Sequence, residues 1–309
     1  MGLRNSKLVR VAREKGVAEV GRRMLWNILH SSGNALIRGA NYFTPDHTMP
    51  LTAADRKLLQ ANTVLKRIHS GRRCFILGNG PSLSRDDLTP LAGEITFVMN
   101  GFFDNPILAK WSPTYHCLSD PAYFNGAEPT RLLKTGAARE HDTTFVVPLH
   151  FRSQIEAEEL LPNARTRYIL FRGELKDSPP KEIDLTSFVP SVWSVSELCI
   201  MIAMYMGCSP IYLLGLDHDW LAHRQEYADW QKYSYKFVIE FQHKLWCGYE
   251  NLLELANRTG TQILNATEGS FLDVFPTASY DSIEFPEHIA GMGASVSAGN
   301  AQPVGAGTA

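Results

Sequence analysis

The most distinctive chemistry in the sequence lies in one short loop, Gly78-Asn79-Gly80-Pro81-Ser82, which follows the apolar run Cys74–Leu77. Glycines at two positions of this loop would let backbone N–H groups approach a ligand closely. Ser82 or Ser84 could cap a following helix, and the positive end of the helix dipole would then favour an anion. Helix starts of this kind hold phosphate groups in many proteins. We therefore predict that the loop binds a phosphate-bearing ligand.

The loop matches neither of the two common phosphate-binding motifs. It lacks the third spaced glycine of GxGxxG, and no lysine follows it as in GxxxxGK[ST]. The Asn79 side chain, between the two glycines, can both donate and accept, which suits a sugar or phosphate oxygen. A tight turn with helix capping only is the alternative interpretation.

Polar side chains also follow other apolar runs. Asp217 and His218 come directly after Ile211–Leu216, and Asp120 follows an earlier run. Open parallel α/β sheets bind ligands at the carboxyl ends of their strands, so these residues are candidates for the same site. Asp217 could hold a ribose hydroxyl, orient the loop, or bind Mg²⁺ together with Asp219. A purely structural turn is the alternative.

Two further pairs are weaker candidates. Ser194 and Ser196 precede an apolar helical run; they are good helix caps, and that helix start could also face a ligand. Asn265 and Thr267 end the last apolar run and could line a pocket for a base or an acceptor. Ordinary turn chemistry is the alternative for this second pair.

The elements that must position these residues begin at residue 73, where short apolar runs start to alternate with polar helical stretches. Runs of β-branched and aromatic residues separated by helices predict an α/β fold, namely a Rossmann-like, mainly parallel sheet with helices on both faces. The apolar run Val195–Met206 predicts a central helix. The predicted strands are Cys74–Leu77, Ile95–Met99, Tyr115–Ser119, Thr144–Pro148, Tyr168–Phe171, Ile211–Leu216 and Gln262–Asn265.

The two ends of the chain differ from this middle part. Residues 1–40 carry eight Lys or Arg against two acids, with apolar residues at helical spacing, which predicts a basic amphipathic helix. It could dock on its own domain, lie on an anionic membrane surface, or contact nucleic acid. Thr52 is expected to cap the next helix. We predict a helical extension over 1–65, an α/β nucleotide(-sugar)-binding catalytic domain over 66–287 and a disordered tail over 288–309.

The bulk composition is that of a globular protein. The chain has 309 residues, of which 44% are hydrophobic and 20% charged, and its net charge of −2 points to neither nucleic acid nor membrane. Its five cysteines stand far apart without a CxxC pair, which favours buried thiols in a reducing compartment. We find neither an apolar run of about 18 residues nor a secretory signal pattern. We therefore expect a cytoplasmic protein.

Four segments, in order, resemble known bacterial families. Arg73–Leu83 (RCFILGNGPSL) resembles the opening of the family called domain of unknown function 115, which is related to 6-hydroxymethylpterin pyrophosphokinase (MptE-like) and to motility-associated factors. It also resembles glycosyltransferase family 42, the sialyltransferases that use CMP-sialic acid. The other three segments are Ile95–Asn100 (ITFVMN), Gly207–Asp217 (GCSPIYLLGLD) and Ile263–Pro276 (ILNATEGSFLDVFP).

The resemblance implies roles for particular residues. In the sialyltransferases this loop grips the CMP moiety, and the asparagine that ends the second strand contacts the donor. A histidine upstream of the last helix serves there as general base, and counting back from Ile263-Leu264 places His243 at that position. A neutral imidazole can take a proton from a hydroxyl at cellular pH, although a surface or core histidine is the alternative. The donor contacts carried over are Gly78, Asn79, Gly80, Pro81, Ser82 and Asn100.

One segment departs from the sialyltransferase pattern. The relatives bind the donor phosphate with two tyrosines just after the Gly-x-Asp strand, whereas here only Tyr227 is near. The phosphate contact would then pass to His218, His223 or Arg224. This departure argues against sialic acid itself as the donor sugar.

Three functions follow as hypotheses. The first is a glycosyltransferase that uses a nucleotide-activated sugar, with a CMP-linked acidic sugar as one candidate, to build a surface polysaccharide or glycan by inverting displacement. It needs a sugar donor and a glycan acceptor but no cofactor, with Mg²⁺ optional. The second is a pyrophosphokinase that acts on a pterin-like alcohol with ATP, with Asp217, Asp219 and Asp120 as Mg²⁺ ligands.

The third hypothesis is a non-catalytic nucleotide-binding scaffold. Under it, the basic segment 1–40 would recruit the chain to the inner face of the cytoplasmic membrane. A homo-oligomer is compatible with all three hypotheses, and none of them involves nucleic acid as a partner.

Overall fold

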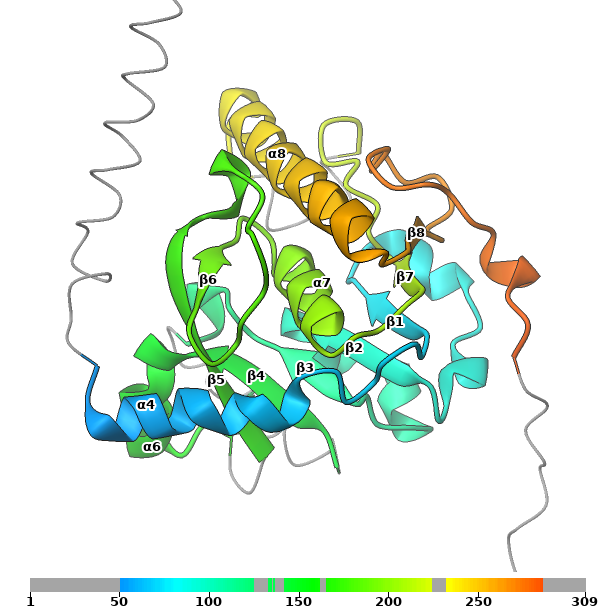
Figure 1. Cartoon of the computed structure of the whole chain (residues 1–309). Helices are drawn as coiled ribbons and strands as arrows, with labels where there is room; N and C mark the ends of the chain where they lie inside the picture. The colour runs from blue at the N-terminus through cyan, green and yellow to red at the C-terminus, as the bar shows by residue number, and fades with distance from the viewer. Residues whose placement is uncertain are drawn as a thin grey trace, which may run out of the picture.

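The short apolar runs of the sequence form the strands of one sheet. The computed structural model describes residues 51–124, 133, 134, 136, 142–161, 165–223 and 232–285. The predicted helix within residues 1–40 and the predicted tail 288–309 lie outside these residues. The strands are β1 (Cys74–Leu77), β2 (Ile95–Met99), β3 (Tyr115–Cys117), β4 (Thr144–Pro148), β5 (Arg165–Glu174), β6 (Phe188–Ser191), β7 (Ile211–Leu214) and β8 (Ile263–Asn265) (Figure 1).

The strand order places a change of direction beside β1. In the described residues the sheet has eight strands in the order β6-β5-β4-β3-β2-β1-β7-β8, and every neighbouring pair is parallel. From β1 the chain moves outward through β2 to β6 and then returns to the other side of β1 as β7 and β8. The carboxyl ends of β1, β2 and β7 therefore meet at one edge, where such folds bind ligands. This confirms the predicted parallel α/β fold.

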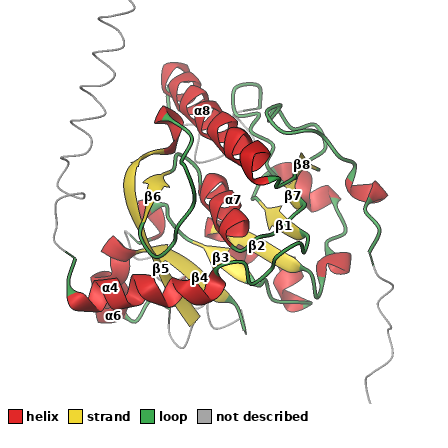
Figure 2. Cartoon of the chain, in the orientation of Figure 1, coloured by secondary structure: helices red, strands yellow, loops and turns green. Residues whose placement is uncertain are grey.

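Alternating residues of the central strands face two different layers, as the two-residue period of a strand requires. One face packs against α7 (Val195–Tyr205) and α8 (Tyr235–Thr259), which lie side by side in Figures 1 and 2. Near β1 and β7 the opposite face is covered by short 3₁₀ helices and by the segment 278–285. Toward β4 and β5, helices α4 (Ala53–Gln60) and α6 (Arg152–Glu158) complete the fold.

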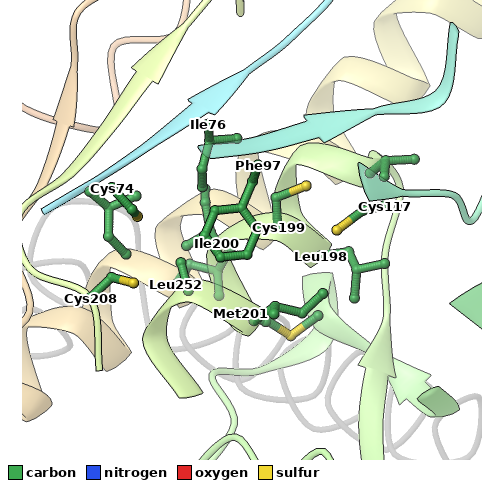
Figure 3. Packing of buried hydrophobic residues seen from close by; sticks show 14 of the residues in the cluster. Cys74, Ile76, Phe97, Cys117, Leu198, Cys199, Ile200, Met201, Cys208 and Leu252 are labelled. Atoms are coloured by element: carbon green, nitrogen blue, oxygen red, sulfur yellow. The ribbon is translucent and has the colours of Figure 1, made fainter. Parts of the chain in front are cut away.

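Helix α7 is the centre of the core, as its apolar sequence predicts. Every residue of it except Met204 is buried. Figure 3 shows Leu198, Ile200 and Met201 of α7 beside Ile76 and Phe97 of the sheet. Four cysteines lie in this core as two close pairs, namely Cys74 with Cys208 and Cys117 with Cys199. The prediction of buried free thiols is confirmed for these four.

The predicted helix caps at Thr52 and Ser194 are present. The Thr52 hydroxyl accepts from the Asp55 N–H at 3.1 Å, and the Asp55 carboxylate accepts from the Thr52 N–H, so the start of α4 is a complete capping box. Ser194 caps α7 in the same way with Glu197. Helix α4 contacts β5, and the Asn62 amide donates to the carbonyl of Tyr168, so residues 53–65 pack on the sheet.

Three features differ from the sequence predictions. Strand β6 was not predicted; it lies at the edge of the sheet and contains Pro190, which fits an edge strand because proline has no backbone N–H to donate to a neighbouring strand. Strand β5 is longer than predicted, and β3, β7 and β8 are shorter.

No described helix is both long enough and apolar enough to cross a membrane.

Candidate functional site

The two glycines of the loop allow β7 to lie very close to the end of β1. A Cβ on Gly78 would overlap the carbonyl oxygen of Gly215 and lie 2.7 Å from Cδ2 of Leu216. A Cβ on Gly80 would overlap the Asp217 carboxylate. The N–H of Gly78 donates to the Leu214 carbonyl at 2.8 Å, and that of Gly80 donates to the Gly215 carbonyl at 2.9 Å. These two amides serve the sheet, which corrects the expectation that they face a ligand.

Asp217 holds the far side of the loop. Its carboxylate accepts from the Ser82 N–H at 3.1 Å and from the Ser82 hydroxyl at 2.8 Å. The residue is only 8% exposed. Burial raises the pKa of Asp217, although both hydrogen bonds from Ser82 oppose that rise. Asp217 and Ser82, both predicted site residues, are thus brought together, and their contact orients the loop.

A 3₁₀ helix, Pro81–Arg85, follows the loop in place of the expected capped α-helix. Its N-cap position is Gly80, which has no side chain to cap it, because both serines lie inside the helix, where the Ser82 hydroxyl donates to Asp217 and the Ser84 hydroxyl donates to the carbonyl of Pro81. The predicted helix dipole is therefore absent, since five residues in 3₁₀ form do not build one of comparable strength. Asn79 remains exposed at the tip of the loop.

A cleft of about 500 Å³ opens between this loop and the turns that follow β2. Its position at the carboxyl ends of β1 and β2 is where the sequence predicts a ligand. Apolar side chains such as Leu83, Phe102 and Ile107 line it together with polar ones. The polar and charged lining residues are Asn79, Ser84, Asp86, Asp87, Asn105 and Lys110. Of these only Asn79 was predicted from the sequence to contact a ligand, and Ser84 was predicted to cap a helix.

Asn100 has an unusual environment beside the cleft. Its backbone is left-handed, with φ of 48°, and its carbonyl accepts from Nε2–H of His116 at 2.9 Å. Its side-chain oxygen is buried and has no partner among the residues that the structure describes. The carbonyl of the neighbouring Met99 accepts from the Asn79 amide at 3.0 Å, so Asn79 lies close to Asn100. A buried acceptor without a donor is costly, so this oxygen lacks a partner that the described residues do not supply.

His218 lies in a buried hydrogen-bonded chain and not in the cleft. Its Nε2 shares a hydrogen bond of 2.7 Å with the Tyr249 hydroxyl, which in turn shares one of 2.6 Å with the Ser196 hydroxyl. Ser196 is bonded to Ser194 at 2.6 Å. Burial lowers the pKa of His218 to about 3, so its imidazole is neutral. Three predicted site residues are thus joined through Tyr249, which no sequence signal indicated.

Glu197 lies at the end of this chain. Its Oε2 accepts from the N–H groups of Trp193 and Ser194 at 2.7 and 2.9 Å, whereas Oε1 is buried without a partner in the described part of the chain. A Cβ on Gly248 of α8 would overlap Oε1, so the carboxyl is enclosed between two helices. Burial raises the pKa of Glu197 to about 8. The Ser-x-x-Glu spacing from Ser194 is the sequence signal that could have identified it.

The remaining predicted site residues that the structure describes do not line the cleft. Asp120 is exposed and accepts from the Ala122 N–H at 2.9 Å. The Asn265 amide donates to the Leu272 carbonyl at 2.8 Å, and the Thr267 hydroxyl accepts from the Leu216 N–H at 3.2 Å. His243 is exposed on α8, with Cys247 one turn away. Tyr227 and Arg224 lie outside the described residues.

Asp217 and Asp219, the proposed Mg²⁺ ligands, both have protein partners. Both oxygens of Asp217 accept from Ser82, and Oδ2 of Asp219 pairs with Nδ1 of His223. Each carboxylate therefore already has a protein partner, which does not fit a cation shared between the two. Within residues 51–285 as far as they are described, no three His, Cys, Asp or Glu side chains are grouped to hold a metal ion.

Asp217→Asn is expected to destabilise the protein by about 1–3 kcal/mol, because an amide offers one acceptor where Ser82 needs two. Ser82→Ala removes only the hydroxyl bond and should cost about 1 kcal/mol. Urea unfolding of both variants measures these differences. Wild-type stability of Asp217→Asn would show that the contact does not hold the loop.

No family model matches the chain, and no curated protein matches it. Among solved structures, it is similar to the MAf glycosyltransferase from Magnetospirillum magneticum AMB-1, with 18% identity and a TM-score of 0.45 over 77% of this chain and 40% of that one. It is also similar to the Campylobacter jejuni sialyltransferase CstII in complex with the substrate analogue CMP-3FNeuAc, with 12% identity and a TM-score of 0.40 over 67% of this chain and 86% of that one. The chain thus spans about 40% of the length of the MAf glycosyltransferase and is distantly similar in structure to two kinds of glycosyltransferase.

Proposed function

We propose that this chain is a glycosyltransferase that binds a nucleotide-activated sugar in the cleft beside Asn79–Pro81. The observation that carries the proposal is the cleft itself. It has a volume of about 500 Å³, which suits a nucleotide, and it lies at the carboxyl ends of β1 and β2. The resemblance of the Arg73–Leu83 segment to the donor loop of sialyltransferases supports the same placement.

The lining of the cleft suits the parts of a nucleotide in different ways. Leu83 and Ile107 offer apolar surface for a base, and Asp87 can accept from ribose hydroxyls. The sequence resemblance adds Asn100, which is next to the lining residue Gly101 and whose side-chain oxygen has no partner among the described residues. Lys110, whose ammonium donates to the Thr89 hydroxyl at 3.1 Å, supplies a positive charge for the phosphate.

The proposed reaction is direct displacement with inversion. An acceptor hydroxyl oxygen attacks the anomeric carbon of the donor sugar, and the bond from that carbon to the phosphate oxygen breaks. The electron pair leaves with the nucleotide. A CMP-linked acidic sugar and a glycan acceptor are the substrates that the sequence resemblance favours, and this chemistry requires no metal.

One nucleotide from a panel of CMP, CDP, UDP, GDP and ATP is expected to stabilise the protein by about 2.7 kcal/mol at a hundredfold excess over its Kd, because it binds only the folded state. Lys110→Ala should raise the Kd of that nucleotide about tenfold or more by removing a charge-assisted contact. Thermal shift and titration calorimetry measure both effects.

Lys236→Ala is the matched control, because Lys236 is exposed on α8 and pairs with Glu240. It should leave the Kd unchanged. A panel in which no nucleotide stabilises the chain would contradict the proposal. Turnover that disappears on adding EDTA, with ATP as the preferred nucleotide, would favour the pyrophosphokinase instead.

A further inference from the structure

Asp86 is the carboxylate in the cleft that local structure does not use. It directly follows the 3₁₀ helix Pro81–Arg85 and lines the cleft. None of the hydrogen bonds or ion pairs among the described residues involves its side chain. The adjacent Asp87 differs, because its Oδ1 accepts from the Thr89 N–H at 2.9 Å and so closes a turn. Asp86 therefore has both oxygens available to a ligand.

The surroundings of Asp86 make it a better base than an exposed aspartate. Burial is the main cause of its raised pKa, and three nearby carboxylates raise the pKa further, whereas Arg85 lowers it. A carboxylate with a raised pKa accepts a proton more readily from an attacking hydroxyl. The charged or titratable groups around it are Asp281, Glu268, Asp217, Arg85, Asp87, Lys110 and Tyr280.

The rival base is His243, and helix geometry places it elsewhere. Successive residues of a helix turn by about 100°, so Leu252, nine positions further on, lies about 180° around α8 from His243. Leu252 is fully buried against the core, whereas His243 is exposed. The imidazole is thus on the outer face of α8, away from the face that packs on the fold.

We propose that Asp86 is the catalytic base of the transfer reaction, a role that rests on the proposed glycosyltransferase function. The Asp86 carboxylate takes the proton from the acceptor hydroxyl as that oxygen forms its bond to the anomeric carbon. The bond from the anomeric carbon to the phosphate oxygen breaks at the same time, and its electron pair leaves with the nucleotide. No oxidant, reductant or further reactant is needed.

The test is Asp86→Asn, with Asp104→Asn as matched control, because Asp104 is an exposed acid in the turn after β2 that does not line the cleft. CMP-sialic acid, UDP-N-acetylglucosamine and GDP-mannose serve as donors, with a mixture of methyl glycosides as acceptors. Asp86→Asn is expected to bind the preferred nucleotide like the wild type and to lose about 10²- to 10⁴-fold in kcat. Asp104→Asn should keep both properties, and Asp86→Glu should recover part of the rate.

The wild-type pH profile gives a readout that needs no variant. We expect kcat/KM to fall toward acid with a midpoint above 3.8, the ordinary value for aspartate, because protonated Asp86 cannot act as base. The residual activity of Asp86→Asn should lack this acid limb. A wild-type profile without an acid limb above pH 3.8 would overturn the assignment.

Two other results would also overturn it. They are full kcat in Asp86→Asn, with or without a weakened nucleotide Kd, and loss of transfer in His243→Ala while Asp86→Asn stays active. Each of these requires a wild-type chain that binds nucleotide and transfers sugar. A wild-type chain that does neither would instead overturn the proposed function, and this inference with it.

Discussion

Gly78→Ala is expected to destabilise the protein by about 3–5 kcal/mol, among the largest effects of a single methyl group. The added Cβ would overlap the Gly215 carbonyl oxygen and approach Cδ2 of Leu216 to 2.7 Å. Because that carbonyl accepts from the Gly80 N–H, it cannot move without breaking the contact between β1 and β7. Urea unfolding should show a lower midpoint with an unchanged slope.

Gly269→Ala provides the comparison, since Gly269 has a left-handed φ of 71° and open space around its Cα. Alanine there meets only the conformational cost of about 1–2 kcal/mol. Gly78 does not have a left-handed φ, so its cost comes from the close approach of β7 and the two variants separate this cause from conformational strain. If Gly78→Ala costs no more than Gly269→Ala, the glycine does not serve the packing that we assign to it.

The strand end beside which the cleft opens could be predicted from the sequence, whereas the purpose of the glycines that follow it could not. The apolar run Cys74–Leu77 followed by glycines indicated a strand end, and the structure has a cleft there. Whether Gly78 and Gly80 serve a ligand or a neighbouring strand depends on β7, which is far away in the sequence. A local motif carries no information about that neighbour.

Residues that act through long-range contacts were the ones that sequence reasoning missed. Lys110 lines the cleft only because the turns after β2 fold back beside the loop. Tyr249 joins His218 and Ser196, which are 31 and 53 residues away from it. His218 itself was predicted correctly to lie beyond the end of a strand, but the packing of α8 buries it.

A pH profile with an optimum is expected for the stability of the fold, because Glu197 and His218 are both held neutral inside it. The pKa of Glu197 is about 8 in the folded chain, against an ordinary value of 4.5. Between these values the folded state holds one proton more than the unfolded state. The stability that Glu197 contributes is therefore complete below pH 4.5 and is lost as pH rises through about 8.

His218 has the opposite dependence. Its pKa is about 3 in the folded chain, against an ordinary value of 6.5, so the folded state holds one proton fewer in that interval. Its contribution is complete above pH 6.5 and is lost as pH falls through about 3. Between pH 4.5 and 6.5 the two differences cancel, and the free energy of unfolding should be flat.

Glu197→Gln tests the alkaline side of this profile. From pH 6.5 to 8 the wild type should lose about 1 kcal/mol of unfolding free energy, because the full slope of about 1.4 kcal/mol for each pH unit is reduced near the pKa of unfolded His218 and near that of folded Glu197. The variant keeps an oxygen that accepts from the Trp193 and Ser194 N–H groups but cannot ionise, so its stability should not fall over this range. Urea unfolding at pH 6.5 and 8 measures the difference. Glu254→Gln, which changes an exposed acid on α8, the helix that packs against α7, should retain the wild-type loss. If the wild type is equally stable at both pH values, the enclosed Glu197 carboxyl is already ionised at pH 6.5, and its burial between α7 and α8 does not hold it neutral.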